Sequence, residues 1–285
     1  MIYLNSVAAF IGLIIGSVAD IKTREIPDWL NFSLIGFGLG NSLLVSILFN
    51  NYHIVGFSIL GFLVGLVIAY LLYRCGQWGG GDAKMLMGLG ALLGFNFTNG
   101  VPDLMVLIMN IFVFGALYGI FWSVYLSIKH REEFKEALKK RLHNTKTMNL
   151  RKILWIFILV GVITSFAFNT QVQLLILAFL AIVFIMFYFF IYTKTVEEAC
   201  MEKKISIDKL TEGDWVLEKV VVKGKKICGP QYSGITKEQI KELLKTKKQH
   251  KKKTIKVREG IPFLPSFLIA FIVMVLFGNW VIILF

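Results

Sequence analysis

Apolar residues fill eight long stretches of the 285-residue chain, and polar residues gather between them. Crossing about 30 Å of hydrocarbon as an α-helix takes about 20 such residues. Two stretches, residues 85–98 and 153–168, are short for a full crossing, which makes a tilted or re-entrant helix an alternative there. The predicted spans are residues 2–19, 29–49, 54–73, 85–98, 104–128, 153–168, 174–193 and 261–285. We therefore expect an all-α polytopic membrane protein with about eight transmembrane helices.

Basic residues lie on only one side of this predicted arrangement. If successive links alternate between the two membrane faces, all 31 Lys and Arg residues fall in four links on the same face: residues 20–28, 74–84, 129–152 and 194–260. An excess of Lys and Arg is typical of cytoplasmic links. These four links are therefore predicted to be cytoplasmic, and both termini extracytoplasmic. The first span lacks the charged start and the cleavage site of a secretory signal, so we expect it to be retained.

Composition and charge narrow the class of protein further. Hydrophobic residues make up 56% of the chain and charged residues 17%, where a soluble domain carries about 25% charged residues. This excludes a soluble enzyme, a disordered chain and a secreted disulfide scaffold. The net charge of +13 is explained by basic links that orient the helices and contact anionic membrane lipids, rather than by nucleic-acid binding. Neither the three cysteines nor the four histidines show metal-ligand spacing, so we expect no metal and no cofactor.

The longest link, residues 194–260, carries structure signals of its own. Residues 215–222 read as a strand, 223–225 as a turn and 226–228 as a return strand. Thr236 and Gln239 have the spacing of a capping box before an amphipathic helix. We therefore predict a small cytoplasmic α+β insert. The domain boundaries that follow are a core of about five helices over residues 1–128, a basic loop with two further spans over 129–193, the insert over 194–260 and a C-terminal span over 261–285.

Two aspartates stand where a predicted span meets the cytoplasm. Asp20 ends the first span, where its charge opposes the helix macrodipole. Asp82 follows Gly79, Gly80 and Gly81 and comes just before the fourth apolar run, and glycines there allow another chain to approach closely. Each aspartate also has a purely structural interpretation: Asp20 can simply end its span, and Asp82 can cap the fourth helix.

Counting the crossings places both aspartates on the same membrane face. Asp82 follows Asp20 by two crossings, so both carboxylates are expected at the cytoplasmic ends of their helices. Two neighbouring carboxylates share a proton, which allows one to act as a base on a water molecule and the other as an acid. The pattern thus favours aspartic-protease chemistry.

The chain resembles the type IV prepilin peptidases, and more closely their archaeal prepilin and preflagellin branch, among the GxGD aspartyl membrane proteases. The resemblance rests on Gly79, Gly81, Asp82 and Lys84 as GxGDxK, on Asp20 to Pro27 as a first motif, and on the order of the crossings between them. It covers about residues 5–125, and residues 258–265 also look like archaeal members. The family implies that Asp20 and Asp82 are the catalytic pair, that the glycines shape the active loop and that Lys84 supports it.

The resemblance further implies cleavage of class III signal peptides, whose basic leader stays in the cytoplasm, from pilin-like or archaellin precursors. The chain has no CxxC segment, so we expect a peptidase core at residues 1–128 without N-methyltransferase activity. The alternatives are an ion or proton-coupled transporter that uses the same aspartates, or a structural assembly factor. Charged residues near the middle of a span are typical of transporters, and the predicted spans contain none.

Overall fold

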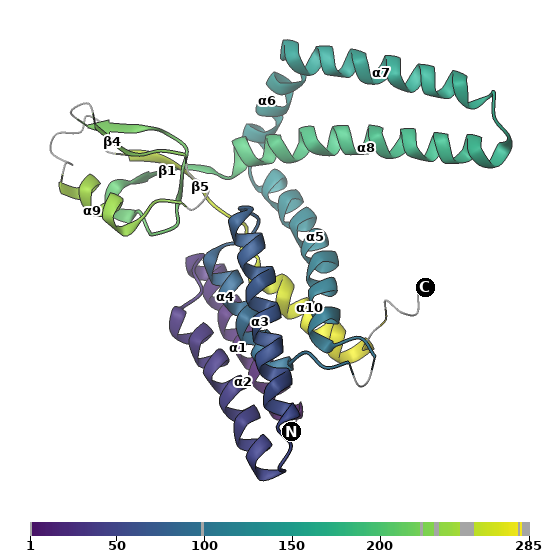
Figure 1. The fold of residues 1–285 in the computed structure, drawn as a ribbon. Coiled ribbons are helices and arrows are strands. Elements are labelled where there is room, and N and C mark those ends of the chain that lie inside the picture. The colour runs from purple at the N-terminus through teal and green to yellow at the C-terminus, as the bar shows by residue number, and fades with distance from the viewer. Residues whose placement is uncertain are drawn as a thin grey trace. The chain divides into compact units, whose positions relative to one another are not determined.

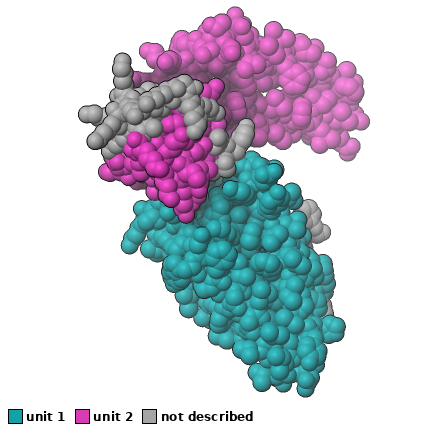
Figure 2. Space-filling view, turned by 60° about the vertical axis from the view of Figure 1, so that its left-hand side comes forward, with its two compact units in different colours: residues 1–121, 260–285 teal, residues 122–259 magenta. Residues whose placement is uncertain are grey.

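The computed structural model of the protein forms two compact units. One unit combines Met1–Phe121 with Gly260–Phe285, and the other is Trp122–Glu259 (Figure 2). The C-terminal segment therefore belongs to the same unit as the N-terminal helices. The residues described are 2–97, 100–222, 225–230, 234–245, 254–278 and 280.

A helical bundle forms the first unit (Figure 1). Its helices are α1 (Ile2–Thr23), α2 (Asp28–Leu48), α3 (His53–Arg74), α4 (Gly80–Leu93), most of α5 (Asp103–Lys129) and α10 (Leu264–Phe277). The short helix α4 packs against α1, α2 and α3, while α10 packs against α1. Met85, Leu86 and Leu89 of α4 are fully buried. The helix that carries Asp82 is thus the centre of this core.

Glycines bring α3 and α4 into backbone contact. A Cβ atom added at Gly61 of α3 would lie 2.2 Å from the carbonyl oxygen of Gly90, and one added at Gly90 would lie 2.3 Å from that of Gly61. Small residues allow such close approach of helices where lipid provides no hydrophobic driving force between them. The α3–α4 crossing is therefore set by glycine rather than by side-chain packing.

The prediction of a polytopic helical protein is confirmed. By length and composition, six described helices are able to cross a membrane: α1 from Leu4, α2, α3, α5, α7 (Thr145–Ser165) and α8 (Thr170–Cys200). The fourth and eighth predicted spans correspond to α4 and α10, which are 14 residues long in the part of the chain described. That α4 and α10 cross the membrane stays a prediction.

In the second unit, α7 and α8 form a long antiparallel hairpin, and α6 (Arg131–Leu142) precedes it (Figure 1). A Cβ added at Gly161 of α7 would lie 2.9 Å from the Leu180 side chain, which shows how closely the two helices pack. Most apolar side chains of the hairpin are nevertheless exposed, as expected for helices that face lipid. Helix α6 was not predicted, because its apolar stripe is short (Phe134, Ala137, Leu138 and Leu142) and stands among charged residues, and none of its residues is fully buried.

The region predicted as an α+β insert contains both strands and a helix. Strands β1 (Glu202–Ser206), β5 (Thr254–Arg258) and β2 (Trp215–Val216) form an antiparallel sheet in the order β1-β5-β2, and β3 (Val220–Val222) pairs with β4 (Lys225–Cys228). The 3₁₀-helix η1 (Ile207–Lys209) and α9 (Lys237–Lys245) complete it. The buried residues of the sheet and of α9 form one hydrophobic core.

The prediction of one strand over residues 215–222 is wrong. The segment divides into β2 and β3, which belong to different sheets. Leu217 donates its backbone N–H to the carbonyl oxygen of Lys256 at 2.9 Å, after which the chain leaves β5. Of the predicted turn at 223–225, Lys225 begins β4 and the two other residues lie outside those described. The capping box is confirmed, because Thr236 and Gln239 exchange backbone-to-side-chain hydrogen bonds of 2.9 and 3.4 Å.

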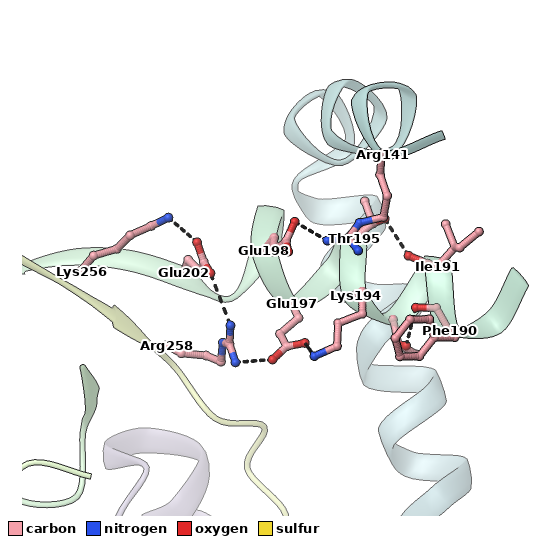
Figure 3. A network of polar contacts seen from close by, with 11 residues as sticks. Arg141, Phe190, Ile191, Lys194, Thr195, Glu197, Glu198, Glu202, Lys256 and Arg258 are labelled. Atoms are coloured by element: carbon pink, nitrogen blue, oxygen red, sulfur yellow. Dashed lines mark hydrogen bonds and ion pairs between the residues drawn. The ribbon is translucent and has the colours of Figure 1, made fainter. Parts of the chain in front are cut away.

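An ion-pair network connects this sheet with the end of α8 (Figure 3). Arg258 of β5 pairs with Glu197 of α8 and with Glu202 of β1. Lys194 also pairs with Glu197, at 2.6 Å between Nζ and Oε2, and Arg141 of α6 pairs with Glu198. These partly buried pairs join α6, α8 and the sheet. Separating the elements would break the pairs and leave partly buried charges without their counter-ions, which is destabilising.

Candidate active site

Asp20 lies in the last turn of α1, and its side chain is buried, with 6% exposed. Helix α1 ends at Thr23, after which Arg24 adopts a left-handed conformation with φ of 60°. The backbone N–H of Arg24 donates to the carbonyl oxygen of Asp20 at 2.9 Å. The chain therefore turns away directly after the helix and leaves the Asp20 carboxylate inside the bundle.

Asp82 is the third residue of α4, and Gly79 is the N-cap of that helix. The Oδ2 atom of Asp82 accepts a hydrogen bond from the backbone N–H of Gly79 at 3.3 Å. A carboxylate in the first turn also interacts favourably with the helix macrodipole. The structural interpretation of Asp82 is thus partly right: its side chain does satisfy the start of α4, but from the first turn and not from the capping position.

The structure brings the two aspartate motifs together. Ile26, in the loop after Asp20, lies so close to Gly81 that a Cβ added there would be 3.0 Å from the Ile26 side chain. Desolvation by the surrounding protein and the charge of Asp20 together raise the pKa of Asp82 to about 7. The two carboxylates therefore lie within electrostatic range of each other. They are 62 residues apart in the sequence.

Two of the three glycines before Asp82, Gly79 and Gly81, stand where there is little room for a side chain. Among the glycines described, a positive φ is found only at positions outside this loop. A Cβ at Gly79 would lie 3.3 Å from Oδ2 of Asp82, and one at Gly81 would press on Ile26. Gly79 and Gly81 thus make room for Asp82 and Ile26 of this chain, and the backbone conformation of all three glycines is open to other residues. Close approach of another chain stays a prediction.

Lys84 forms an ion pair with Asp28, with 2.6 Å between Nζ and Oδ1. Both side chains are substantially exposed, so the pair contributes little to stability. It joins the first turn of α2 to the first turn of α4. The role of Lys84 as a supporting residue remains a prediction.

Three residues near the two aspartate motifs were not predicted from the sequence. Leu264, at the start of α10, donates its backbone N–H to Oδ2 of Asp20 at 2.9 Å. Tyr118 of α5 lies within electrostatic range of Asp20, and the buried ring of Trp78 directly precedes Gly79. No local sequence pattern predicts the hydrogen bond between Asp20 and Leu264, which are 244 residues apart. The two prolines around Leu264 indicate only that a helix starts there.

With this geometry established, known proteins provide a comparison. Residues 7–120 match the model of the Type IV leader peptidase family. The matched region contains both aspartates, the glycines and Lys84, and it ends before α10. The resemblance inferred from the sequence is thereby confirmed for this part of the chain.

Similar curated proteins carry the name preflagellin peptidase. The chain is 43% identical to that of Methanococcus maripaludis over 83 residues, 39% identical to that of Methanocaldococcus jannaschii over 90 residues and 40% identical to that of Methanococcus voltae over 83 residues. These matches cover 29%, 32% and 29% of this chain. The chain spans only 36%, 38% and 35% of the length of these relatives. No solved structure matches.

Proposed function

We propose that the protein is a membrane aspartyl endopeptidase that removes class III signal peptides from preflagellin or type IV prepilin-like precursors. The observation that carries the proposal is the meeting of the two aspartate motifs: Gly81 packs against Ile26, and the charge of Asp20 acts on Asp82. The matched family and the names of the similar proteins support the same substrate class.

The proposed reaction uses the carboxylates as a pair that holds one proton. The ionised member takes a proton from a water molecule as the water oxygen attacks the scissile carbonyl carbon, and the protonated member donates its proton to the carbonyl oxygen. Collapse of the tetrahedral intermediate then returns a proton to the leaving amine. Because the two groups titrate together, neither aspartate is assigned as the base.

The depth of the pair agrees with this type of substrate. Asp20 lies at the end of α1, and Asp82 at the start of α4. On the predicted topology, both face the cytoplasm at the membrane boundary. A class III leader is basic and remains on the cytoplasmic side, while the apolar helix that follows it enters the membrane. The scissile bond between them therefore lies at the cytoplasmic membrane boundary, at the depth of the two aspartates.

The first prediction concerns the two aspartates. Purified protein in detergent is expected to cut a preflagellin precursor after its basic leader. Asp20→Asn and Asp82→Asn, which keep the shape and lose the charge, should each lower kcat at least 10³-fold, while the exposed Asp103→Asn should retain it. Cleavage is followed by gel shift and mass spectrometry of the product.

Different results would point to the alternatives. Near-normal cleavage by either single variant would contradict the two-aspartate mechanism. A folded wild-type protein that cuts neither preflagellin nor prepilin would contradict the peptidase function, and an assay of ion flux in vesicles would then test the transporter.

A further inference from the structure

The first turn of α10 lies against Asp20. The backbone N–H of Leu264 donates to Oδ2 of Asp20 at 2.9 Å, and this hydrogen bond is buried. The backbone N–H of Phe263 lies near the same carboxylate and acts on it electrostatically. The C-terminal helix therefore supplies a backbone donor to one of the two proposed catalytic groups.

This contact explains an otherwise unfavourable position. A carboxylate at the C-terminal end of α1 opposes the dipole of its own helix, and a buried charge without donors is costly. The N-terminus of a helix offers free N–H groups and a partial positive charge. Pro262 and Pro265 have no N–H, and the N–H of Ser266 bonds to the carbonyl oxygen of Phe263. The donors left for Asp20 are those of Phe263 and Leu264.

The same turn also contacts the segment that carries Asp82. The ring of Trp78 packs against Phe263 and Phe267, with centroid distances of 6.0 and 5.0 Å. Trp78 directly precedes Gly79, whose N–H binds Asp82. One turn of helix thus touches both aspartate motifs, on one side by a hydrogen bond and on the other by ring packing.

Two glycines make room for this turn. A Cβ added at Gly16 of α1 would lie 2.4 Å from the Leu264 side chain, and one added at Gly115 of α5 would lie 2.7 Å from the Phe263 ring. Leu264 and Phe267 are fully buried. The turn is therefore held closely on two sides, and its donors have little freedom to move away from Asp20.

We propose that the first turn of α10, Phe263 to Phe267, is a positioning element of the aspartate site, which fixes the Asp20 carboxylate through the N–H of Leu264. The inference rests on the proposed peptidase function and extends the site beyond residues 7–120, the part that matches the family. The turn acts through Asp20 and the Trp78 segment.

The test removes one hydrogen-bond donor, the backbone N–H of Leu264, and keeps the leucine side chain. Leu264 is replaced in the full-length protein by its α-hydroxy analogue through nonsense suppression, so that an ester oxygen stands where the N–H was. The matched control is the same replacement at Ile269, in the middle of α10, where the N–H is an ordinary helix donor. Steady-state cleavage of a preflagellin precursor and the unfolding temperature are measured for both proteins.

We expect the ester at Leu264 to lower kcat about 10- to 100-fold with KM within twofold, because a misplaced catalytic group costs rate and not substrate binding. The ester at Ile269 should keep kcat within about threefold of wild type. In a double-mutant cycle, the ester at Leu264 should lower the unfolding temperature more in the wild-type background than beside Asp20→Ala.

Three results would overturn the inference. Equal kcat for the two ester proteins would mean that the N–H has no specific role. A fall in kcat matched by a rise in KM would mean a disturbed bundle, and additive unfolding temperatures would mean that the bond does not form. If the wild-type protein cuts no precursor, the proposed function itself fails; if it cuts and the Leu264 ester protein has the same kcat as the Ile269 ester protein, only the positioning role fails.

Discussion

Asp82 is the residue whose ionisation the fold changes most clearly. Its pKa rises from 3.8 to about 7, because desolvation and the charge of Asp20 both disfavour the ionised form. Between about pH 4 and pH 7 the folded protein therefore holds a proton that the unfolded chain has released. By linkage, the free energy of unfolding falls as the pH rises through this window.

This gives a prediction for stability. Between pH 5 and pH 8, the unfolding temperature of the wild-type protein in detergent should fall more than that of Asp82→Asn, which has no proton to lose. Differential scanning fluorimetry at matched ionic strength checks this, with the exposed Asp103→Asn as control. A difference between wild type and Asp82→Asn that stays constant with pH would contradict the raised pKa.

At the residue scale, the sequence predicted the candidate pair but not its surroundings. Asp20 and Asp82 follow from the position of charged residues at span ends and from the number of crossings between them, and their motifs meet at Ile26 and Gly81 in the structure. The bond between Asp20 and Leu264 does not follow, because a backbone donor carries no side-chain signature. Contacts of this kind depend on the packing of whole helices.

At the scale of elements, the α3–α4 crossing is the most sensitive to side-chain size. Gly61→Ala should lower the unfolding temperature by several degrees, because the added methyl group would lie 2.2 Å from the Gly90 carbonyl oxygen and must separate the two backbones. Gly56→Ala in the same helix is the matched control, since a Cβ there meets nothing within 4 Å. Equal unfolding temperatures for the two variants would contradict the close crossing.

The elements themselves were predictable where the apolar pattern is long. Each of the eight predicted spans has a helix, since an apolar run of about 20 residues has few other stable forms in lipid. The strands β1 and β5 were missed for two reasons. About 50 residues separate them in the sequence, and the alternation of apolar and polar residues along each strand is weak. The helix α6 was missed because its apolar face has only four residues and most of its other residues are charged.

At the scale of the whole molecule, the distribution of charge predicts how the chain lies in the membrane. Every Lys and Arg falls in the links of one face, and the links at 50–53, 98–103 and 169–173 have none. The exposed apolar side chains of α7 and α8 are explained if lipid surrounds these helices. An inverted arrangement would carry all the basic links across the membrane, against the orienting effect of Lys and Arg.

Cysteine labelling tests this orientation. The native Cys75 is exposed and lies in a link predicted to be cytoplasmic. In cells that express the protein, a membrane-impermeant maleimide should therefore label it only after permeabilisation. Asn51→Cys, combined with Cys75→Ser, places a thiol at an exposed position of the link between α2 and α3 and should be labelled in intact cells. Because these sites are separated by the single crossing of α3, labelling of both from outside would contradict a crossing there. Reversed labelling would place Asp20 and Asp82 on the outer face, where a cytoplasmic leader cannot reach them.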